Sequence, residues 1–232
     1  MFNYFGAKHR LAPTYQAPRH PTIIEPFAGA AGYSCYWLTQ RSDLRAIIVD
    51  SNPLVVELWR LLLSMTPTDI DTYPTPIQGE RSSDLLWASA ASATSSWGAI
   101  ANTGEFQVTE WIARDFPGQR RRMADLRWRI GDRISVISGD YSDSPDIEAT
   151  WFIDPPYQDQ GVWYEHNGDV IDFDRLGEWC RARPGQAIVC EAGDADWLPF
   201  DHHATAMTQV NGIQSEVVWC SHPEPTLLDL IS

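Results

Sequence analysis

The chain has 232 residues, and its 31 acidic and 17 basic side chains give it a formal net charge of −14 at pH 7. This length suits one well-buried α/β domain with a small insertion, and it falls short of two full domains. The acidic charge argues against a protein that binds nucleic acid tightly and without regard to sequence, because such binding comes from Lys and Arg contacts with phosphates.

Neither a signal peptide nor a membrane span is predicted. Residues 1–4 lack a basic region followed by an apolar stretch, and no run of about 18 apolar residues occurs. We therefore expect a soluble, cytoplasmic protein. The four cysteines are widely spaced and three lie in apolar runs, which predicts reduced structural thiols and gives no zinc pattern. We expect no metal.

Two strand–helix units are predicted in the first 65 residues. Each has an apolar strand followed by a turn and a helix, with strands at 22–25 and 45–50 and helices at 33–38 and 53–63. Asn52 is a good cap residue for the second helix, and Pro53 suits its first position. Successive units of this kind predict a parallel, doubly wound sheet with helices on both faces.

Residues 66–131 differ in character and predict a helical insertion. Pro- and Ser-rich connections separate expected helices at 85–93, 106–116 and 119–130. The arginines Arg114, Arg120, Arg121, Arg122, Arg127, Arg129 and Arg133 crowd into this segment, beside Trp87, Trp97, Trp111 and Trp128. Such interleaving is typical of contact with nucleic acid. A solvated helix whose arginines pair with nearby acids gives the same pattern, and core packing is the default expectation for each tryptophan.

The sheet is predicted to resume after the insertion and to end in a hairpin. Strands are expected at 134–137, 150–153 and 187–190, with a helix at 172–182 that starts at Asp172. The last strands, 204–210 and 213–220, flank Asn211-Gly212, a strong hairpin signal. The predicted fold class is α/β, with a doubly wound, mostly parallel sheet that ends in an antiparallel hairpin.

Three acids end successive predicted strands, namely Asp50, Asp140 and Asp154. The carboxyl ends of parallel strands meet at one edge of a sheet, where ligands of such folds bind. Asp50 lies about 20 residues after the small-residue turn at 27–32, a spacing that suits a ribose. That turn is not a G-x-G-x-x-G sequence, which weakens the interpretation as a pyrophosphate site.

Asp154-Pro155-Pro156-Tyr157 follows an apolar strand and suits a flat ring that carries an amino group. The prolines fix φ and remove two backbone donors, so acceptors are in surplus there. The carboxylate and the exposed carbonyls accept hydrogen bonds, and Tyr157 offers a ring face for stacking. A strand that ends in a plain surface turn would have the same sequence, so this interpretation stays open as well.

In their order, these motifs resemble the Dam-type DNA adenine-N6 methyltransferases, which use S-adenosylmethionine. Tyr4-Phe5-Gly6-Ala7-Lys8 is similar to the family's N-terminal aromatic-x-Gly-Gly-Lys motif, residues 25–29 to its cofactor loop, and residues 154–157 to its catalytic DPPY motif. Ala7 replaces the second glycine of the family's N-terminal motif, and Ala30-Ala31-Gly32 replaces the commoner Ala-Gly-Ser of its cofactor loop. The resemblance implies a fold of the S-adenosylmethionine-dependent methyltransferase type.

The resemblance also implies a division of the chain and a set of site residues. The catalytic domain would comprise 1–65 and 132–232, with a DNA-recognition segment at 66–131. Catalytic roles would fall on Lys8, Asp154, Pro155, Pro156 and Tyr157. The cofactor would contact Tyr4, Lys8, Phe27, Ala28, Gly29, Asp50, Asp140, Tyr141 and Asp154. Tyr164 and His166 are candidates to close over the base, and Arg114, Arg120, Arg121, Arg122, Arg127 and Arg129 are candidates for DNA contact.

The implied reaction is methyl transfer to the N6 amino group of an adenine flipped out of double-stranded DNA, in a prokaryotic or phage-infected cell. Methylation of cytosine-N4 or of adenine in RNA stays open, because the motif serves any planar amino group. Asp rather than Ser at position 154 favours adenine by family analogy. The residues are also compatible with an inactive nucleic-acid-binding relative and with a nicotinamide oxidoreductase. The motifs identify neither the recognition sequence nor a partner nuclease.

Overall fold

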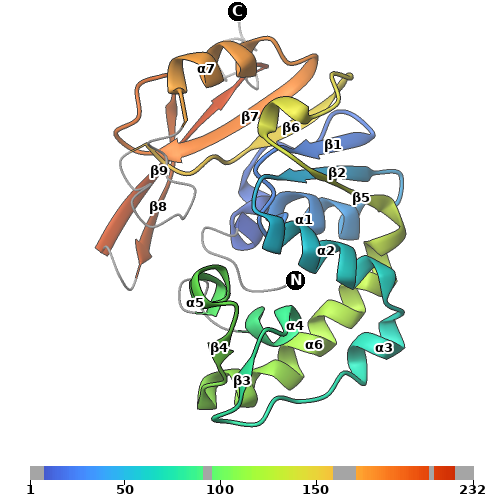
Figure 1. Ribbon diagram of the computed structural model, residues 1–232. Helices are drawn as coiled ribbons and strands as arrows, with labels where there is room; N and C mark the ends of the chain where they lie inside the picture. The colour runs from blue at the N-terminus through green and yellow to red at the C-terminus, as the bar shows by residue number, and fades with distance from the viewer. Residues whose placement is uncertain (1–7, 91–95, 159–170, 209–211, 223–232) are drawn as a thin grey trace, which may run out of the picture.

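A computed structural model describes residues 8–90, 96–158, 171–208 and 212–222 of the chain. Seven strands form its main sheet: β1 (Thr22–Glu25), β2 (Arg45–Asp50), β5 (Ile134–Ser138), β6 (Ala149–Ile153), β7 (Gly185–Ala192), β8 (Asp201–Thr208) and β9 (Gly212–Cys220). Their order across the sheet is β5-β2-β1-β6-β7-β9-β8 (Figure 1).

The first five of these strands in the sheet order pair in parallel, while β9 runs antiparallel to β7 and β8 antiparallel to β9. The chain first winds outward from β1 through β2 to β5, then crosses back to β6 and winds the other way. The direction of winding therefore reverses between β1 and β6, and such a switch point is where ligands bind in open α/β sheets. The predicted fold class, including the terminal hairpin, is confirmed.

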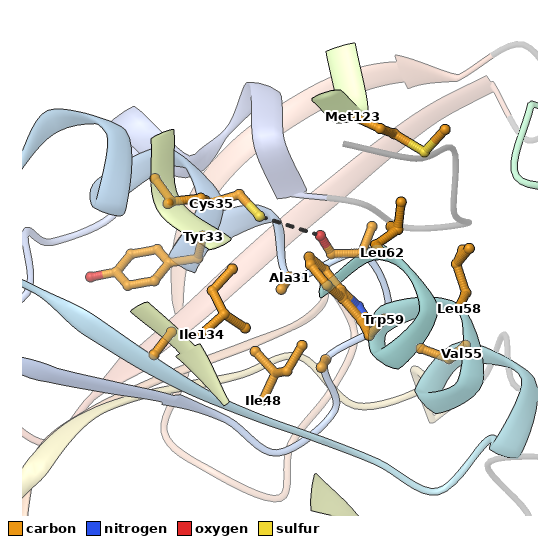
Figure 2. Packing of buried hydrophobic residues seen from close by; sticks show 14 of the residues in the cluster. Ala31, Tyr33, Cys35, Ile48, Val55, Leu58, Trp59, Leu62, Met123 and Ile134 are labelled. Atoms are coloured by element: carbon orange, nitrogen blue, oxygen red, sulfur yellow. Dashed lines mark hydrogen bonds between the residues drawn. The ribbon is translucent and has the colours of Figure 1, made fainter. Parts of the chain in front are cut away.

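Helices cover both faces of the sheet, because alternate strand residues enter two separate cores. α1 (Gly32–Gln40), α2 (Pro53–Ser64) and α6 (Glu110–Ile130) contribute to the larger core, and α7 (Phe173–Arg181) contributes to the smaller one. In β1, Ile23 enters the larger core and Ile24 the smaller. Figure 2 shows part of the larger core, in which Trp59 of α2 lies among apolar side chains from the sheet and α6.

The insertion differs from its predicted structure in several places. The helices expected at 106–116 and 119–130 are one helix, α6, which Thr109 caps and which runs through Pro117. Before α6, the insertion contains five short elements: α3 (Pro67–Asp71), β3 (Arg81–Ser82), α4 (Leu85–Ala88), α5 (Ser96–Thr103) and β4 (Phe106–Gln107). β4 pairs with β3 where a helix was expected, and α5 was not predicted. The helix predicted from residue 85 ends at Ala88, and residues 91–95 lie outside the described part of the chain.

The error at α6 has a physical reason. The dipeptide Pro117-Gly118 is a common helix boundary, since proline lacks an N–H and glycine has low helix propensity. Here the apolar side chains Ile112, Phe116, Met123 and Ile130 are all buried on both sides of that dipeptide. Tertiary burial along the whole length therefore outweighs the local penalty, and the helix continues.

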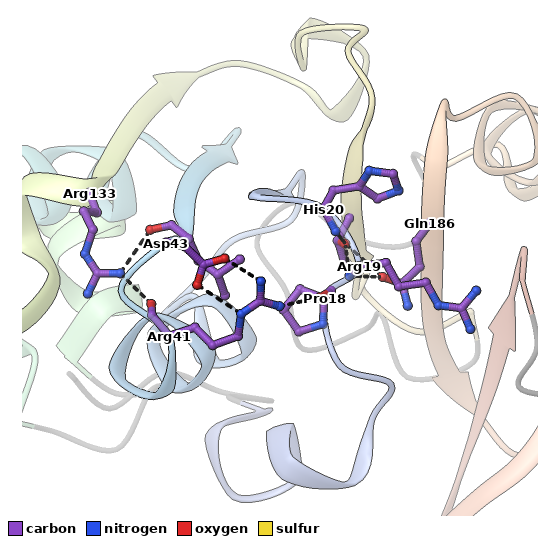
Figure 3. A network of polar contacts seen from close by, with 9 residues as sticks. Pro18, Arg19, His20, Arg41, Asp43, Arg133 and Gln186 are labelled. Atoms are coloured by element: carbon purple, nitrogen blue, oxygen red, sulfur yellow. Dashed lines mark hydrogen bonds and ion pairs between the residues drawn. The ribbon is translucent and has the colours of Figure 1, made fainter.

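The segment that precedes β1 is fixed to the rest of the molecule by a polar network (Figure 3). Arg41 donates a hydrogen bond of 2.8 Å to the Pro18 carbonyl, and the Arg19 backbone N–H donates to Gln186 Oε1 at 3.0 Å. Arg133 donates to the carbonyls of Arg41 and Leu44, which fixes the connection between α1 and β2. These bonds hold the chain that leads back to Lys8 in a defined position.

None of the described helices combines the length and hydropathy that a membrane crossing requires. All four cysteines are free thiols, and Cys35, Cys180 and Cys190 are buried.

Candidate active site

Acidic side chains from four adjacent strands gather at the carboxyl edge of the sheet. Glu25 and Asp50 are the last residues of β1 and β2, Asp154 directly follows β6, and Asp140 follows β5 by two residues. Because these strands are neighbours and parallel, their ends lie at the same edge. The structure thus brings together the three acids that the sequence predicts to converge, and adds Glu25.

Asp154 forms a buried ion pair with Lys8. Lys8 Nζ lies 3.2 Å from Asp154 Oδ1, and the two side chains are only 8% and 19% exposed. Lys8 also donates a hydrogen bond to the Tyr157 hydroxyl, and its ammonium lies 4.8 Å from the centroid of that ring. The structure therefore joins the first and the last of the three motifs that the sequence singles out.

The charges of this group shift its protonation equilibria. Burial raises the pKa of Asp154 to about 6, although the Lys8 ammonium acts in the opposite direction. Burial lowers the pKa of Lys8, but the negative groups around it, Asp154 first, outweigh this effect and leave the pKa well above its usual value. Lys8 is therefore protonated at neutral pH. Asp154 is mostly ionised at neutral pH, and it accepts a proton more readily than an ordinary aspartate does.

Glu216 is a member of this group that sequence reasoning missed. It lies in β9, and its Oε2 is 3.4 Å from Lys8 Nζ. Its other oxygen, Oε1, accepts a hydrogen bond from the Tyr15 hydroxyl. The available signal was an acid beside the apolar run Val217-Val218-Trp219, in a strand whose neighbours in the sheet are buried.

Lys8 reaches the site because its backbone packs directly against Gly32. Lys8 begins a short 3-10 helix, η1 (Lys8–Arg10), and a second one, η2 (Ala12–Thr14), leads to Tyr15. A Cβ atom on Gly32 would lie 2.6 Å from the His9 nitrogen and 2.9 Å from the Lys8 nitrogen. Only glycine allows this approach without displacement of the backbone.

The turn after β1 is tight and is tied to Asp50. Gly29 and Ala31 both have positive φ, 47° and 48°. The left-handed conformation costs a residue with a Cβ, such as Ala31, about 1–2 kcal/mol. The Gly29 N–H donates to Asp50 Oδ2 at 2.7 Å, and the Asn52 N–H donates to Asp50 Oδ1 at 2.8 Å. Trp59 Nε1 donates to the Gly29 carbonyl at 2.8 Å, so a buried side chain of α2 also holds the turn.

Two aromatic rings lie beside this turn. The Phe27 and Tyr141 rings stack with their centroids 5.5 Å apart and an interplanar angle of 27°. Tyr141 is buried in the smaller core, whereas Phe27 is half-buried and Asp140 is exposed. Asp140 caps the short helix η4 (Tyr141–Asp143), since its Oδ1 accepts a hydrogen bond of 3.1 Å from the Ser142 N–H.

Glu191 secures the chain just beyond residues 154–157. Its carboxylate accepts hydrogen bonds from the Ala192 N–H at 2.8 Å and from Trp197 Nε1 at 3.2 Å, and the Gln158 backbone N–H is a further partner. Burial raises the pKa of Glu191 to about 7. The residue that follows Tyr157 is thus bonded to the end of β7.

The candidate arginines for DNA contact fall into two groups along α6. Arg120 donates to the Tyr73 carbonyl, and Arg127 donates to the Met65 carbonyl at 3.1 Å and pairs with Asp132 at 2.8 Å. These two serve the packing of α6 against the preceding loops. The other four are exposed on the surface of α6: Arg114, Arg121, Arg122 and Arg129.

Two of the four tryptophans contradict the expectation of core packing. Trp97 is buried and Trp87 is partly buried, but Trp111 and Trp128 on α6 are 65% and 78% exposed. The Arg114 guanidinium lies 4.1 Å from the centroid of the Trp111 ring, which is a cation–π geometry. A helix with exposed aromatic and cationic side chains presents them to solvent or to a partner.

Three candidate site residues, Tyr4, Tyr164 and His166, lie outside the described residues. Within the described part of the chain, no cluster of three or more His, Cys, Asp or Glu side chains is placed to hold a metal ion.

No model of a known protein family matches the chain, and no curated protein matches it in sequence. Several solved structures are similar in shape. The mitomycin 7-O-methyltransferase MmcR matches at 10% identity and a TM-score of 0.42, over 91% of this chain and 52% of that one. Precorrin-6y C5,15-methyltransferase from Geobacter metallireducens GS-15 matches at 10% identity and a TM-score of 0.41, over 90% and 84%.

The glycopeptide N-methyltransferase MtfA, in complex with S-adenosylmethionine, matches at 13% identity and a TM-score of 0.40, over 95% of this chain and 67% of that one. The chain spans about half the length of the mitomycin enzyme. Likenesses this distant assign neither a substrate nor a reaction.

Proposed function

We propose that the protein is an S-adenosylmethionine-dependent methyltransferase that methylates the N6 amino group of an adenine flipped out of double-stranded DNA. The observation that carries this proposal is the buried ion pair of Lys8 with Asp154, which lies beside Tyr157 at the switch point of the sheet. This ion pair joins the N-terminal motif, which contains Lys8, to the motif at residues 154–157, and both motifs resemble those of the Dam-type enzymes.

The residues at the end of β1 and β2 fit the nucleoside part of the cofactor. The turn holds only small side chains from Ala28 to Gly32, which leaves room for a ligand against the backbone. Asp50 is half-buried at the strand end, and a carboxylate there accepts hydrogen bonds from the two ribose hydroxyls. Phe27 would line the adenine side of the cofactor, and the exposed Asp140 would accept a hydrogen bond from the adenine amino group.

S-Adenosylmethionine supplies a methyl group on a positively charged sulfur, which needs no metal to react. The protein's part is to place an amino nitrogen in line behind that methyl group and to exclude water. The Asp154 carboxylate and the Pro155 carbonyl would accept the two amino hydrogens. This localises the nitrogen lone pair, which is otherwise delocalised into the base, and so raises its nucleophilicity.

Tyr157 and the surface of α6 would serve the nucleic acid. A base within a duplex cannot reach the site, so it has to be flipped out, at a cost of a few kcal/mol. Stacking on the Tyr157 ring would hold the flipped base, while the exposed arginines of α6 would bind phosphates. Because the protein as a whole is acidic, we expect its DNA binding to be weak and sensitive to salt.

The proposal is tested with labelled S-adenosylmethionine and separate duplex DNA, single-stranded DNA and RNA substrates, followed by identification of the modified base. N6-methyladenine in duplex DNA is the expected product. N4-methylcytosine or methylated RNA would redirect the substrate assignment, and binding of a nicotinamide cofactor without methyl transfer would refute the proposal.

Asp154→Asn is expected to reduce methyl transfer at least about 100-fold, because the neutral amide loses the negative acceptor. Binding of S-adenosylmethionine should persist, as followed by tryptophan fluorescence. Asp146→Asn is the matched control, since Asp146 is a 73% exposed acid in the loop before the same strand. Normal activity of Asp154→Asn would refute this mechanism.

A further inference from the structure

The buried group around Lys8 carries one more negative charge than positive charge. Lys8 is shared by two carboxylates, Asp154 at 3.2 Å and Glu216 at 3.4 Å, and the Glu216 side chain is only 13% exposed. A buried charge without a partner is costly, and proteins retain such groups mostly where function needs them. The second carboxylate is not required to neutralise the lysine, because Asp154 already does so.

No other cation among the described residues balances this surplus. The chain has 17 Lys and Arg residues, and every one of them lies in the described part. Among the ion pairs of this part, Asp154 and Glu216 pair only with Lys8. His203, which faces the group from β8, has a pKa lowered by burial and is neutral at physiological pH.

The remaining titratable groups that face the site do not cancel the charge either. Burial raises the pKa of Tyr15, of Tyr157 and of the Cys190 thiol, so all three are neutral. Burial also raises the pKa of Glu25 to about 8, which leaves it mostly protonated at neutral pH. The group of Lys8, Asp154 and Glu216 therefore has a net charge of −1.

Glu216 is held in place and cannot turn away from Lys8 without loss of contacts. The Tyr15 hydroxyl donates to one of its oxygens, and the Tyr15 ring stacks on His203 with centroids 4.6 Å apart and an interplanar angle of 10°. His203 Nε2 in turn lies 2.8 Å from Thr14 Oγ1. The hairpin and the N-terminal segment thus clamp the carboxylate beside the lysine.

We propose that Glu216 is a charge-setting residue, which keeps the site negative so that it prefers the positively charged cofactor to its neutral product. This inference rests on the proposed function. In the reaction the bond from sulfur to the methyl carbon breaks and its electron pair stays on sulfur, while a bond from nitrogen to that carbon forms. One amino proton then leaves to Asp154 and on to solvent. The cofactor loses its positive charge and becomes S-adenosylhomocysteine.

A negative site therefore attracts the cofactor more than the product. Without Glu216, Lys8 would cancel the charge of Asp154, and the site would lose this preference. With Glu216, the product is released more readily than the cofactor, since both share the same nucleoside and differ at sulfur. A carboxylate that contacts the same ammonium as Asp154 suffices, because charges interact over longer distances in a buried site than in water.

The test compares two substitutions at one position in the full-length protein. Glu216→Gln keeps the shape and removes the charge, whereas Glu216→Asp keeps the charge and changes the shape. Dissociation constants for S-adenosylmethionine and S-adenosylhomocysteine are measured at about pH 7.5 by calorimetry. Their ratio should shift toward the product roughly threefold to tenfold in Glu216→Gln and stay near the wild-type ratio in Glu216→Asp.

Glu148→Gln is the control, because Glu148 is a 77% exposed glutamate just before β6 and should leave the ratio unchanged. A purely structural role of Glu216 would weaken both ligands equally in Glu216→Gln, and an unchanged ratio there overturns the inference. If the wild-type protein binds neither ligand, the proposed function itself fails, and this outcome is distinct from an unchanged ratio.

Discussion

Gly32 shows at the residue scale how a missing side chain positions Lys8. A Cβ atom on Gly32 would collide with backbone atoms of Lys8 and His9, and backbone atoms cannot move aside as the end of a flexible side chain can. The first residue of α1 is thereby in contact with the segment that supplies the ammonium to Asp154. Glycine is needed at position 32 because the backbone of Lys8 and His9 approaches it closely, and not because of an unusual φ.

Gly32→Ala should therefore reduce methyl transfer by about tenfold or more and lower the free energy of unfolding by about 1–3 kcal/mol, as overpacking does. Gly118→Ala is the control, because a Cβ there would meet its nearest atom at 3.6 Å, an ordinary contact. Transfer rates and denaturant unfolding curves of both variants check this. Equal activity of the two variants would show that the backbone contact does not position Lys8.

The residues of the site were predictable from sequence only where they lie in local motifs. Asp154 and Tyr157 stand out because prolines and an apolar strand surround them, and Lys8 belongs to a motif of its own. Glu216 has no such neighbourhood, since only the register of β9 beside β7, which pairs it with Ala192, brings it to the site. Its bond with Tyr15 joins residues 201 positions apart. A contact of this range leaves no local pattern.

At the scale of elements, α6 combines a buried apolar face with arginines of two kinds, bonded to backbone carbonyls or exposed. Its buried face carries the apolar residues that pack on α1, α2, α3 and α4. Arg127 on the same helix donates to a backbone carbonyl, whereas Arg121 is exposed. The sequence shows a cluster of arginines but cannot separate these roles, because the carbonyls that fix Arg120 and Arg127 come from distant loops.

Arg121→Gln and Arg127→Gln should consequently affect different properties, DNA binding and stability. The first should weaken DNA binding uniformly across sequences and reduce the salt dependence of binding by about one phosphate contact, with stability unchanged. The second should lower the free energy of unfolding by about 1–3 kcal/mol, because it leaves the Met65 carbonyl without its donor. DNA titrations at several salt concentrations and unfolding curves check both. Equal salt dependence in Arg121→Gln and the wild type would remove that residue from the DNA contact.

At the scale of the whole molecule, the mostly parallel sheet and its terminal hairpin follow from the sequence more securely than the structure of the insertion does. Apolar strands alternate with helices from β1 to α2 and again from β6 to β7, and Asn211-Gly212 predicts the terminal hairpin. The insertion lacks such periodicity. Its helices before α6 are short and depend on burial against α6, which local propensity does not report.

The pH dependence of stability is a second property of the whole molecule. Burial raises the pKa of Glu25 to about 8, so the folded protein holds this proton while the unfolded chain releases it near the usual value of 4.5. Folding stability from this group is therefore fully present below about pH 4.5 and is lost as pH rises through about 8. Glu191, whose pKa burial raises to about 7, contributes with the same sign.

We expect the free energy of unfolding to fall from about pH 5 to about pH 9, by at most about 1.4 kcal/mol per pH unit for each group. Mutual repulsion among the 31 acidic residues adds to this trend. Glu25→Gln should flatten the curve, since the amide does not titrate, and Glu148→Gln should not. Denaturant unfolding across this range measures both. Stability that rises with pH would contradict the assignment of a protonated Glu25.

The contacts of Tyr15 with Glu216 and His203 also have a consequence for when the site can assemble during synthesis. Lys8 and the turn at residues 27–32 precede in the chain the strands that hold Glu216 and His203, so they are synthesised first. Because Lys8 contacts Glu216 of β9, the ion network can be completed only after β9 has been synthesised and has joined the sheet. A nascent chain that stops before β9 already contains residues 154–157, yet it acquires the complete charge arrangement only once β9 is in place.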